Sequence, residues 1–404
     1  MDDTVEYRAG YLRCIDGCIG LFRNRLFQAL MFSMRLPLPT MPFITRLKLF
    51  LSITLINLLC CQPAFSAQAE IIESAGMKVR LQQVANGFGV IWGMAFLDSN
   101  RLLMTEREGS IKLLDIAKRR STEIKNAPEV LAQGQGGMLD VVLAPDFAVS
   151  GWIYFTYVKD IDIESDGVTV LARAKLKDDA LTDWQELLVT RSGTDTSQHF
   201  GSRIAFDEDG HVYFGIGDRG VRENSQDLSN HAGSIMRLNI DGSVPSDNPH
   251  KHNKKWLAEV WSIGHRNPQG MAYDAVNNRL WSIEHGPRGG DELNLIKKGA
   301  NYGWPVISYG KEYWGPIAVG EGTHREGMEQ PVKVYTPSIA PGSLLYYSGD
   351  ALPGWKGNLF SGALKLRHLN RIVISEQGKA IQEERLLEDM DERIRALAQG
   401  PQGW

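Results

Sequence analysis

The hydrophobic positions of this chain recur in one pattern: a short apolar run, a polar turn, and a second run that is rich in aromatic residues. Both runs have the length of β-strands, and strong helical periodicity is scarce. The pattern therefore predicts pairs of adjacent strands. These pairs begin near Gly93, Val141, Ile204, Met271 and Ser343, and a sixth begins near Ile394 and is cut off by the end of the sequence.

The spacing of these units predicts the fold. It varies between about 45 and 75 residues, the range expected for the blades of a β-propeller with loops of variable length. Glycine is abundant, at 41 of 404 residues. We therefore expect an all-β, six-bladed β-propeller that is truncated in its last blade. An ordinary β-sandwich with similar hairpins is the alternative.

The first 69 residues do not follow this pattern. Residues 1–40 show no period and are expected to be an upstream extension that results from an early start codon. Residues 41–69 have the form of a secretory signal peptide. It has basic residues at Arg46 and Lys48, an apolar run from Leu49 to Cys61, and small residues at Ala67 and Ala69. The apolar run is too short to span a bilayer comfortably, so we expect cleavage, with lipid attachment to a cysteine as the alternative.

Composition agrees with export of residues 70–404 as a catalytic propeller domain. The four cysteines are Cys14, Cys18, Cys60 and Cys61, so the mature chain would have no thiol to mispair in an oxidising compartment. Removal of residues 1–69 takes away seven basic and four acidic side chains, which changes the net charge from −4 to −7. This mildly acidic balance argues against nucleic acid or an anionic membrane as a partner. A periplasmic or secreted protein without stable membrane insertion is expected.

Candidate chemical groups lie at the boundaries of the units, where the loops of a propeller converge on its axis. The densest stretch, 262–305, contains Arg266 and Asn267, the turn Gly286-Pro287 and the acidic pair Asp291-Glu292. This combination suggests a hard cation held by carbonyls and carboxylates beside an anion held by arginine. Other candidates at unit boundaries are Gln135, His199, Asp218, Lys365, Arg393 and Arg395.

Each candidate also has a structural explanation. Histidine is more often a structural residue than a catalyst, and spacing does not choose among His199, His211, His231, His265 and His285. The charged side chains could face solvent or protect strand edges. The pattern alone therefore indicates an exported propeller with a polar face that suits calcium.

At these residues the chain resembles the soluble quinoprotein aldose sugar dehydrogenases, which use pyrroloquinoline quinone (PQQ). The resemblance extends from about Lys78 to Trp404. The motifs that carry it are Gly134-Gln-Gly-Gly-Met-Leu-Asp, His199-Phe-Gly-Ser-Arg, Gly264-His-Arg-Asn-Pro-Gln-Gly, Glu284-His-Gly-Pro-Arg-Gly-Gly-Asp-Glu, Gly299-Ala-Asn-Tyr-Gly-Trp-Pro and Arg393-Ile-Arg.

The resemblance implies oxidation of the anomeric hydroxyl of aldose sugars to lactones, with hydride transfer to PQQ and a separate electron acceptor. His199 falls on the family's general base, and Asp218 falls on the carboxylate that orients it. A neutral imidazole suits proton removal near neutral pH. Arg266 falls on a residue that stabilises the charge that grows on the quinone oxygens.

The resemblance also implies the ligands of the cofactors. The backbone carbonyls of Gly286 and Pro287 match a catalytic Ca²⁺ site, and Glu292 with the Tyr302 carbonyl matches a second, structural one. The residues that match PQQ contacts are Gln135, Arg266, Asn267, Ser338, Lys365, Arg393 and Arg395. Arg393 and Arg395 alternate with Ile394, so on a strand both would point to the same face.

The sequence departs from the family pattern at two places, and two alternative functions remain open. Gln198 stands where some relatives have an acid, and the strands expected after Trp404 are absent from this sequence. A calcium-dependent propeller lactonase would also place calcium on the axis, but it would not need the cations Lys365, Arg393 and Arg395. A non-catalytic propeller that binds a protein partner is the second alternative.

Overall fold

The computed structural model describes residues 70–161 and 166–403, so the predicted extension and signal peptide lie outside the described residues. The described chain consists of β-strands connected by loops, with one short helix, α3 (Phe147–Ser150). Three 3-10 turns, η1 (Arg222–Gln226), η2 (Pro353–Trp355) and η3 (Glu388–Met390), lie in loops. In this part of the chain, no helix is long and apolar enough to cross a membrane.

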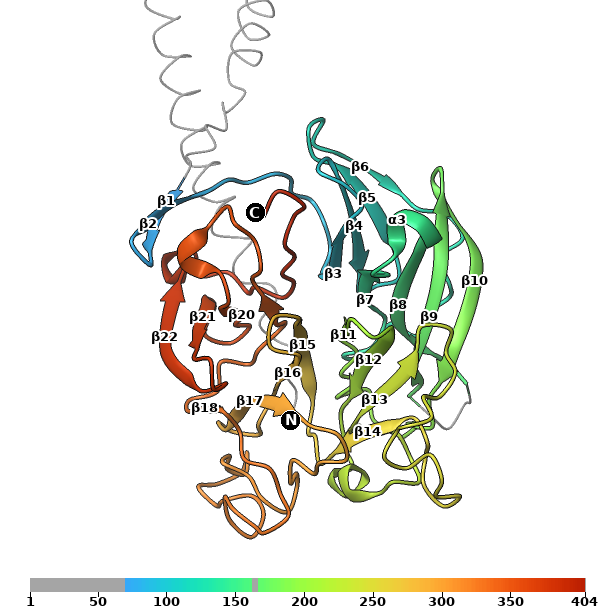
Figure 1. Cartoon of the computed structure of the whole chain (residues 1–404), viewed down its shortest axis with the longest axis vertical. Coiled ribbons are helices and arrows are strands. Elements are labelled where there is room, and N and C mark those ends of the chain that lie inside the picture. The colour runs from blue at the N-terminus through green and yellow to red at the C-terminus, as the bar shows by residue number, and fades with distance from the viewer. Residues whose placement is uncertain (1–69, 162–165, 404) are drawn as a thin grey trace, which may run out of the picture. The chain divides into compact units, whose positions relative to one another are not determined.

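Five antiparallel sheets of four strands each form the blades of a β-propeller, and they follow one another around a ring (Figure 1). Blade 1 contains β3 (Ile91–Phe96), β4 (Arg101–Glu106), β5 (Ile111–Asp115) and β6 (Arg120–Glu123). Blade 2 contains β7 (Met138–Leu143), β8 (Trp152–Lys159), β9 (Val168–Lys177) and β10 (Ala180–Val189). Blade 3 contains β11 (Ile204–Phe206), β12 (His211–Ile216), β13 (Ser234–Asn239) and β14 (Val260–Ile263).

The same order continues in the remaining sheets. Blade 4 contains β15 (Pro268–Asp274), β16 (Arg279–Glu284), β17 (Asp291–Ile296) and β18 (Lys333–Tyr335). Blade 5 contains β19 (Leu345–Tyr346), β20 (Leu359–Gly362), β21 (Leu369–Ile374) and β22 (Ala380–Leu386). A separate two-stranded sheet pairs β1 (Glu70–Ser74) with β2 (Met77–Leu81). The five complete strand pairs predicted from the sequence are thus confirmed as the first two strands of each blade.

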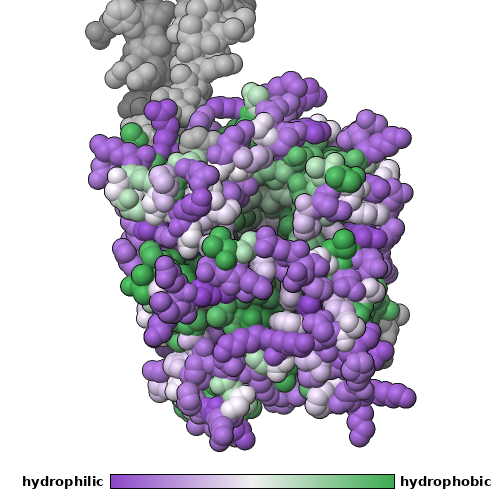
Figure 2. Space-filling view, viewed as in Figure 1, coloured by the Kyte–Doolittle hydropathy of each residue, from purple (hydrophilic) through white to green (hydrophobic). Residues whose placement is uncertain are grey.

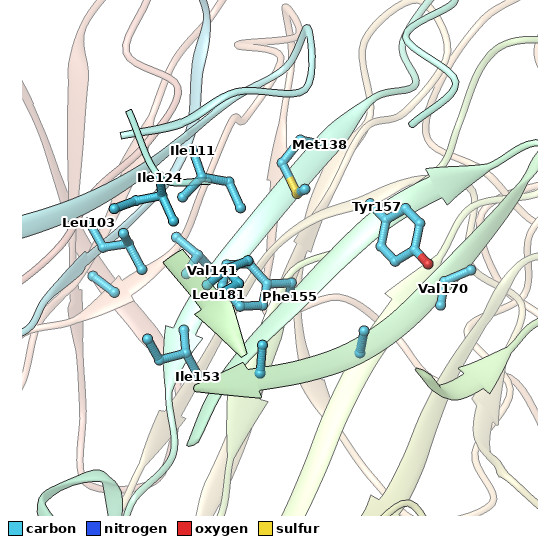
Figure 3. Close-up of a cluster of buried hydrophobic side chains, with 13 residues drawn as sticks. Leu103, Ile111, Ile124, Met138, Val141, Ile153, Phe155, Tyr157, Val170 and Leu181 are labelled. Carbon is cyan, nitrogen blue, oxygen red and sulfur yellow. The ribbon is translucent and has the colours of Figure 1, made fainter. Parts of the chain in front are cut away.

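The hydrophobic core lies between neighbouring blades. Because successive side chains of a strand point to opposite faces, a strand that is covered on both sides needs apolar residues throughout. The six central residues of β8 are all buried. Figure 3 shows the cluster in which Leu103 and Ile111 of blade 1 pack with Met138, Phe155 and Val170 of blade 2. The face seen in Figure 2 is mainly hydrophilic, and hydrophobic residues are visible mostly in its hollows.

The first strand of each blade lies toward the axis, and β7, β11, β15 and their neighbours contact one another there. Three of these strands have a shift in register near their beginning. The shifts occur around Trp92 in β3, Asp140 in β7 and Gln269 in β15. A β-bulge turns a side chain away from the regular alternation, which is why bulges are common beside functional sites.

The segment 391–403 runs between blade 5 and blade 1 (Figure 1). The amide of Ser348 donates to Gln399 Oε1 at 2.9 Å, and Gly400 lies against the ring of Phe96. Residues 391–403 occupy this gap but do not form a strand. The prediction that Arg393 and Arg395 lie on a strand is therefore wrong, because no described strand pairs with this backbone. The structure confirms five blades, and the sixth stays a prediction.

Candidate active site

His199 and Asp218 form a close pair at the start of blade 3. His199 precedes β11, and Asp218 follows β12, so the antiparallel pairing of these strands brings both loops to one end of the blade. The imidazole Nδ1 of His199 lies 2.6 Å from Asp218 Oδ1. Asp218 Oδ2 accepts a hydrogen bond from the indole nitrogen of Trp304 at 2.8 Å. Both oxygens of the carboxylate are therefore held.

Burial and neighbouring charges set the protonation states of the pair. Burial lowers the pKa of His199, the bond to Asp218 raises it, and the charge of Arg266 lowers it, with a net decrease. Burial by itself would raise the pKa of Asp218, but the hydrogen bond to His199 and the positive charge of Arg266 hold it below its ordinary value. An ionised Asp218 fixes the proton of a neutral His199 on Nδ1, which leaves Nε2 as a proton acceptor.

The backbone of His199 is held in an uncommon conformation. Its φ of 58° lies in the left-handed region, which most residues avoid. The amide of His199 donates to Gln135 Oε1 at 2.9 Å. On the other side, a Cβ added at Gly217 would lie 2.6 Å from the carbonyl oxygens of His199 and Arg266, so only glycine fits there. The position of the imidazole is thus determined by its main chain as well as by Asp218.

Arg266 reaches the turn that was predicted to bind calcium. Its Nη1 donates to the carbonyl oxygens of Gly286 at 3.0 Å and His285 at 3.2 Å. The Pro287 carbonyl accepts a bond from the hydroxyl of Tyr313 at 2.9 Å. Each carbonyl has a second lone pair, so both remain available as ligands. The Nε of Arg266 is among the buried nitrogens of the described residues that have no hydrogen-bond partner.

A small pocket next to this turn contains two carboxylates, Glu284 and Glu292, together with Tyr302 and Arg266. Burial, and then repulsion by Glu284, raises the pKa of Glu292 to about 8. A bound cation would stabilise the ionised form of such a carboxylate, because it offsets both the loss of hydration and the repulsion by Glu284. In the described residues, no group of three His, Cys, Asp or Glu side chains is placed to hold a metal. Ligands for an ion here would therefore have to include carbonyl oxygens.

The other four histidines considered from the sequence make contacts outside the His199–Asp218 pair. His265 is fully buried, and its two ring nitrogens lie within hydrogen-bond distance of Glu284 and Ser262. The Nε2 of His285 contacts the Pro341 carbonyl at 2.7 Å, and burial lowers the pKa of His285 to about 3. His231 accepts a bond from the Arg191 amide. His211, the first residue of β12, contacts Asp207 and Arg237.

The predicted PQQ contacts come together only in part. Asn267 Oδ1 accepts bonds from the Gln269 side chain at 3.2 Å and the Gly201 amide at 3.3 Å. Arg395 Nη1 donates to Gln269 Oε1 at 3.3 Å, so Asn267 and Arg395 are connected through one glutamine. Lys365 and Arg393 are exposed.

Asp291 and Ser338 connect two loops. The hydroxyl of Ser338 donates to Asp291 at 2.8 Å, and Asp291 also accepts bonds from the amides of Gly286, Ile339 and Ala340. Asp291 therefore fastens the Gly286-Pro287 turn to the loop that contains Ser338. The lysine predicted to bind PQQ is attached to the same loop, because the Lys365 amide donates to the Ile339 carbonyl.

Sequence reasoning missed two residues that complete the site. Trp304 lies within the quoted Gly299–Pro305 motif, but its bond to Asp218 spans 86 positions and has no local signal. Glu284 begins another quoted motif and accepts bonds from the amide of Arg266 and the side chain of Asn294. A glutamate at the end of an expected strand, shortly before Gly286 and Pro287, was the available signal.

Comparison with known proteins identifies the family. A model of the glucose/sorbosone dehydrogenase family matches residues 88–404. The aldose sugar dehydrogenase YliI of Escherichia coli (strain K12) is 40% identical over 318 residues, which cover 78% of this chain and 85% of that protein. The crystal structure of the soluble aldose sugar dehydrogenase from Escherichia coli in its apo form superimposes with a TM-score of 0.75 at 38% identity, covering 78% of this chain and 92% of that one.

A structure with bound cofactor is also similar. The PQQ-bound form of aldose sugar dehydrogenase from Streptomyces coelicolor superimposes with a TM-score of 0.66 at 29% identity, covering 83% of this chain and 90% of that one. The family model covers most of the chain, and the relatives span nearly the whole propeller. This chain belongs to the glucose/sorbosone dehydrogenase family, within the soluble aldose sugar dehydrogenases.

Proposed function

We propose that this protein is a PQQ- and calcium-dependent dehydrogenase that oxidises the anomeric hydroxyl of aldose sugars to a lactone. The observation that carries the proposal is the His199–Asp218 pair, buried beside Arg266 in a member of a sugar dehydrogenase family. A neutral imidazole with one nitrogen fixed by a carboxylate is the usual arrangement of a general base.

His199 acts on the sugar in this proposal. Its Nε2 removes the proton of the C1 hydroxyl, while the hydride leaves C1 and the C1–O bond becomes the lactone carbonyl. Asp218 keeps the Nδ1 proton in place and stabilises the imidazolium that forms. Trp304 keeps Asp218 ionised by donating to its second oxygen. When bound, PQQ supplies the hydride acceptor, and Ca²⁺ makes its carbonyl more electrophilic.

The residues around Arg266 suit the cofactors. The Nε of Arg266 is buried and without a partner among the described residues, which is unfavourable unless an acceptor binds there. A quinone oxygen is such an acceptor. The Gly286 and Pro287 carbonyls would serve as calcium ligands, and Asp291 fixes their turn through the Gly286 amide. Glu292 and the Tyr302 carbonyl would hold a second ion, which compensates the Glu284–Glu292 repulsion.

The proposal assigns the PQQ carboxylates to a cationic set, Lys365, Arg393 and Arg395, because three carboxylates near the axis need compensating charge. Gln135, Asn267 and Ser338 complete the contacts. We further propose that residues 41–69 direct export to the periplasm or outside, that the segment 391–403 stands in the place of the inner strand of a sixth blade, and that the electrons pass to a separate acceptor.

Reconstitution tests the function directly. Apo-protein is mixed with PQQ, Ca²⁺, glucose and a redox dye, and each of the first three is omitted in turn. Dye reduction that requires all three supports the proposal. Dye reduction without PQQ, or hydrolysis of a lactone by the metal-loaded protein without PQQ, would overturn it, and the second result would favour the lactonase.

A further inference from the structure

One arginine at the axis contacts every sector of the ring. Arg203 lies directly before β11 of blade 3 and is 6% exposed. Its Nη1 donates to Asp140 Oδ1 of blade 2 at 2.8 Å, and its Nε donates to the Gln269 carbonyl of blade 4 at 3.2 Å. Its Nη2 donates to the carbonyls of Gly342, just before blade 5, at 2.8 Å and of Arg395 at 2.9 Å.

The remaining sector is blade 1. There the guanidinium carbon of Arg203 lies 4.0 Å from the centre of the Trp92 ring, a cation–π contact. Trp92, Asp140 and Gln269 are the residues at the register shifts of their strands. At these three bulges, the Trp92 ring, the Asp140 carboxylate and the Gln269 carbonyl all contact the same guanidinium. The planar fork of arginine, with five N–H donors, is what allows one side chain to hold acceptors in several directions.

The bond from Arg203 Nη2 to the Arg395 carbonyl, here called the tether, has a particular consequence. The segment 391–403 has no strand pairing, so few backbone bonds hold it. The tether fixes the main chain at Arg395, whose side chain donates to Gln269. Arg393 lies two residues earlier in the same segment. An error in this backbone position would move both cations of the segment.

We propose that Arg203 is a positioning residue for cofactor binding: by holding the Arg395 carbonyl, it places Arg393 and Arg395 for the PQQ carboxylates. It does not contact the reacting atoms, and none of its hydrogen bonds among the described residues goes to His199 or Asp218. This inference rests on the proposed function. It predicts that loss of the tether weakens PQQ binding but leaves the rate of the bound enzyme nearly unchanged.

The test uses Arg203→Lys, which keeps the charge beside Asp140 but lacks the fork that reaches several carbonyls. Arg237→Lys is the matched control, because Arg237 is also 6% exposed, with an ion pair to Asp247 and a cation–π contact to Trp261 in blade 3. Three quantities are measured on the full chain: hydrogen–deuterium exchange of residues 391–403 without cofactor, the PQQ dissociation constant in excess Ca²⁺, and kcat at saturating PQQ.

For Arg203→Lys we expect faster exchange in 391–403 and kcat within about threefold of wild type. The PQQ dissociation constant should rise at least about tenfold, since loss of a hydrogen bond made by a charged group weakens a site by about that factor. Arg237→Lys should change none of the three. Unchanged exchange overturns the tether, and faster exchange with unchanged PQQ affinity overturns the positioning role. Equal changes in both variants would mean a general loss of stability and would also overturn it.

Two further controls keep the result interpretable. If Arg203→Lys does not fold, Asp140→Asn is used, because it preserves side-chain volume but removes the charge that holds the guanidinium; the same three outcomes then apply. Wild-type protein that binds no PQQ would refute the proposed function. Exchange of 391–403 without cofactor still tests the tether in that case, so the two failures are distinguishable.

Discussion

The indole nitrogen of Trp304 donates to Asp218 Oδ2 at 2.8 Å, while Asp218 Oδ1 holds His199 at 2.6 Å. The carboxylate therefore connects a loop of blade 4 to a residue of blade 3. A hydrogen bond donated to a carboxylate favours its ionised form, so we expect Trp304 to support the basicity of His199 without touching it.

Replacement of Trp304 tests this relationship. Trp304→Phe keeps an aromatic ring but removes the donor, so the pKa of Asp218 should rise and the orientation of His199 should weaken. We expect kcat to fall by about tenfold, equivalent to one hydrogen bond to a charged group, with little change in PQQ affinity. Trp261→Phe in β14 is the control. A Trp304→Phe enzyme with wild-type kcat would show that the indole bond has no part in catalysis.

Removal of the base should have a larger effect. His199→Asn is expected to lower kcat by at least about 100-fold, the usual contribution of a general base. The dissociation constant of PQQ, measured by titration of apo-protein, should stay within about threefold of wild type, because His199 acts on the sugar in this proposal. A threefold change corresponds to less free energy than one ordinary hydrogen bond contributes. Substantial turnover in this variant would mean that another residue is the base, and His265→Asn then tests a second buried histidine that is paired with a carboxylate.

The pH dependence follows from the direction of the His199 shift. Burial lowers the pKa of this imidazole below 6.5, so His199 is neutral and active at all pH values above that lowered pKa. As pH falls through it, the ring becomes protonated and kcat/KM should fall. We expect an acidic limb with a midpoint below 6.5, measured on the reconstituted enzyme. A midpoint above 6.5 would contradict this, since it would mean that Asp218 outweighs burial.

Calcium should affect both activity and stability. Chelation is expected to abolish dye reduction and to lower the melting temperature, because an ion at Glu292 stabilises the folded state only; a ligand at 100 times its dissociation constant contributes about 2.7 kcal/mol. Glu292→Gln should lose much of this stabilisation by calcium. Glu329→Gln, at a half-buried residue paired with Lys297, is the control. Identical melting curves with and without chelator would refute the second calcium site.

The two arginines of the last segment should differ. Arg395 is half-buried and bonded to Gln269, whereas Arg393 is exposed. We expect Arg395→Ala to weaken PQQ binding by about 2–5 kcal/mol, the cost of truncating a buried charge pair. Arg393→Ala should cost less, about 1 kcal/mol, because solvent screens an exposed pair. Lysine at position 395 should rescue only partly. Unchanged affinity in both alanine variants would remove the cationic set from the proposal.

The sequence predicted what depends on local pattern and on motifs. Five strand pairs followed from the alternation of short apolar runs and turns, as with Ile204 in β11 and Val212 in β12. The His199–Asp218 pair followed from the family motifs, and the structure brings the two side chains into contact. Residues on, or directly beside, strands that are neighbours in the chain could therefore be predicted to meet.

Relationships that depend on closure of the ring could not be predicted. The bond between Arg203 and the Arg395 carbonyl joins residues 192 positions apart, and no periodicity connects them. The prediction that Arg393 and Arg395 lie on a strand failed for the same reason, because strand formation depends on a partner edge and not on the alternation of side chains alone. The contacts of Arg203 exist only when the blades are assembled around the axis.

The left-handed backbone of His199 gives this position an unusual mutational tolerance. Most side chains are strained at a φ of 58°, and β-branched residues are strained most. Asparagine and glycine tolerate this conformation, so they should abolish activity while the protein remains folded. Valine or isoleucine should reduce both activity and the yield of soluble protein. A saturation library at this one codon would therefore separate the demands of catalysis from those of folding without any change elsewhere in the propeller.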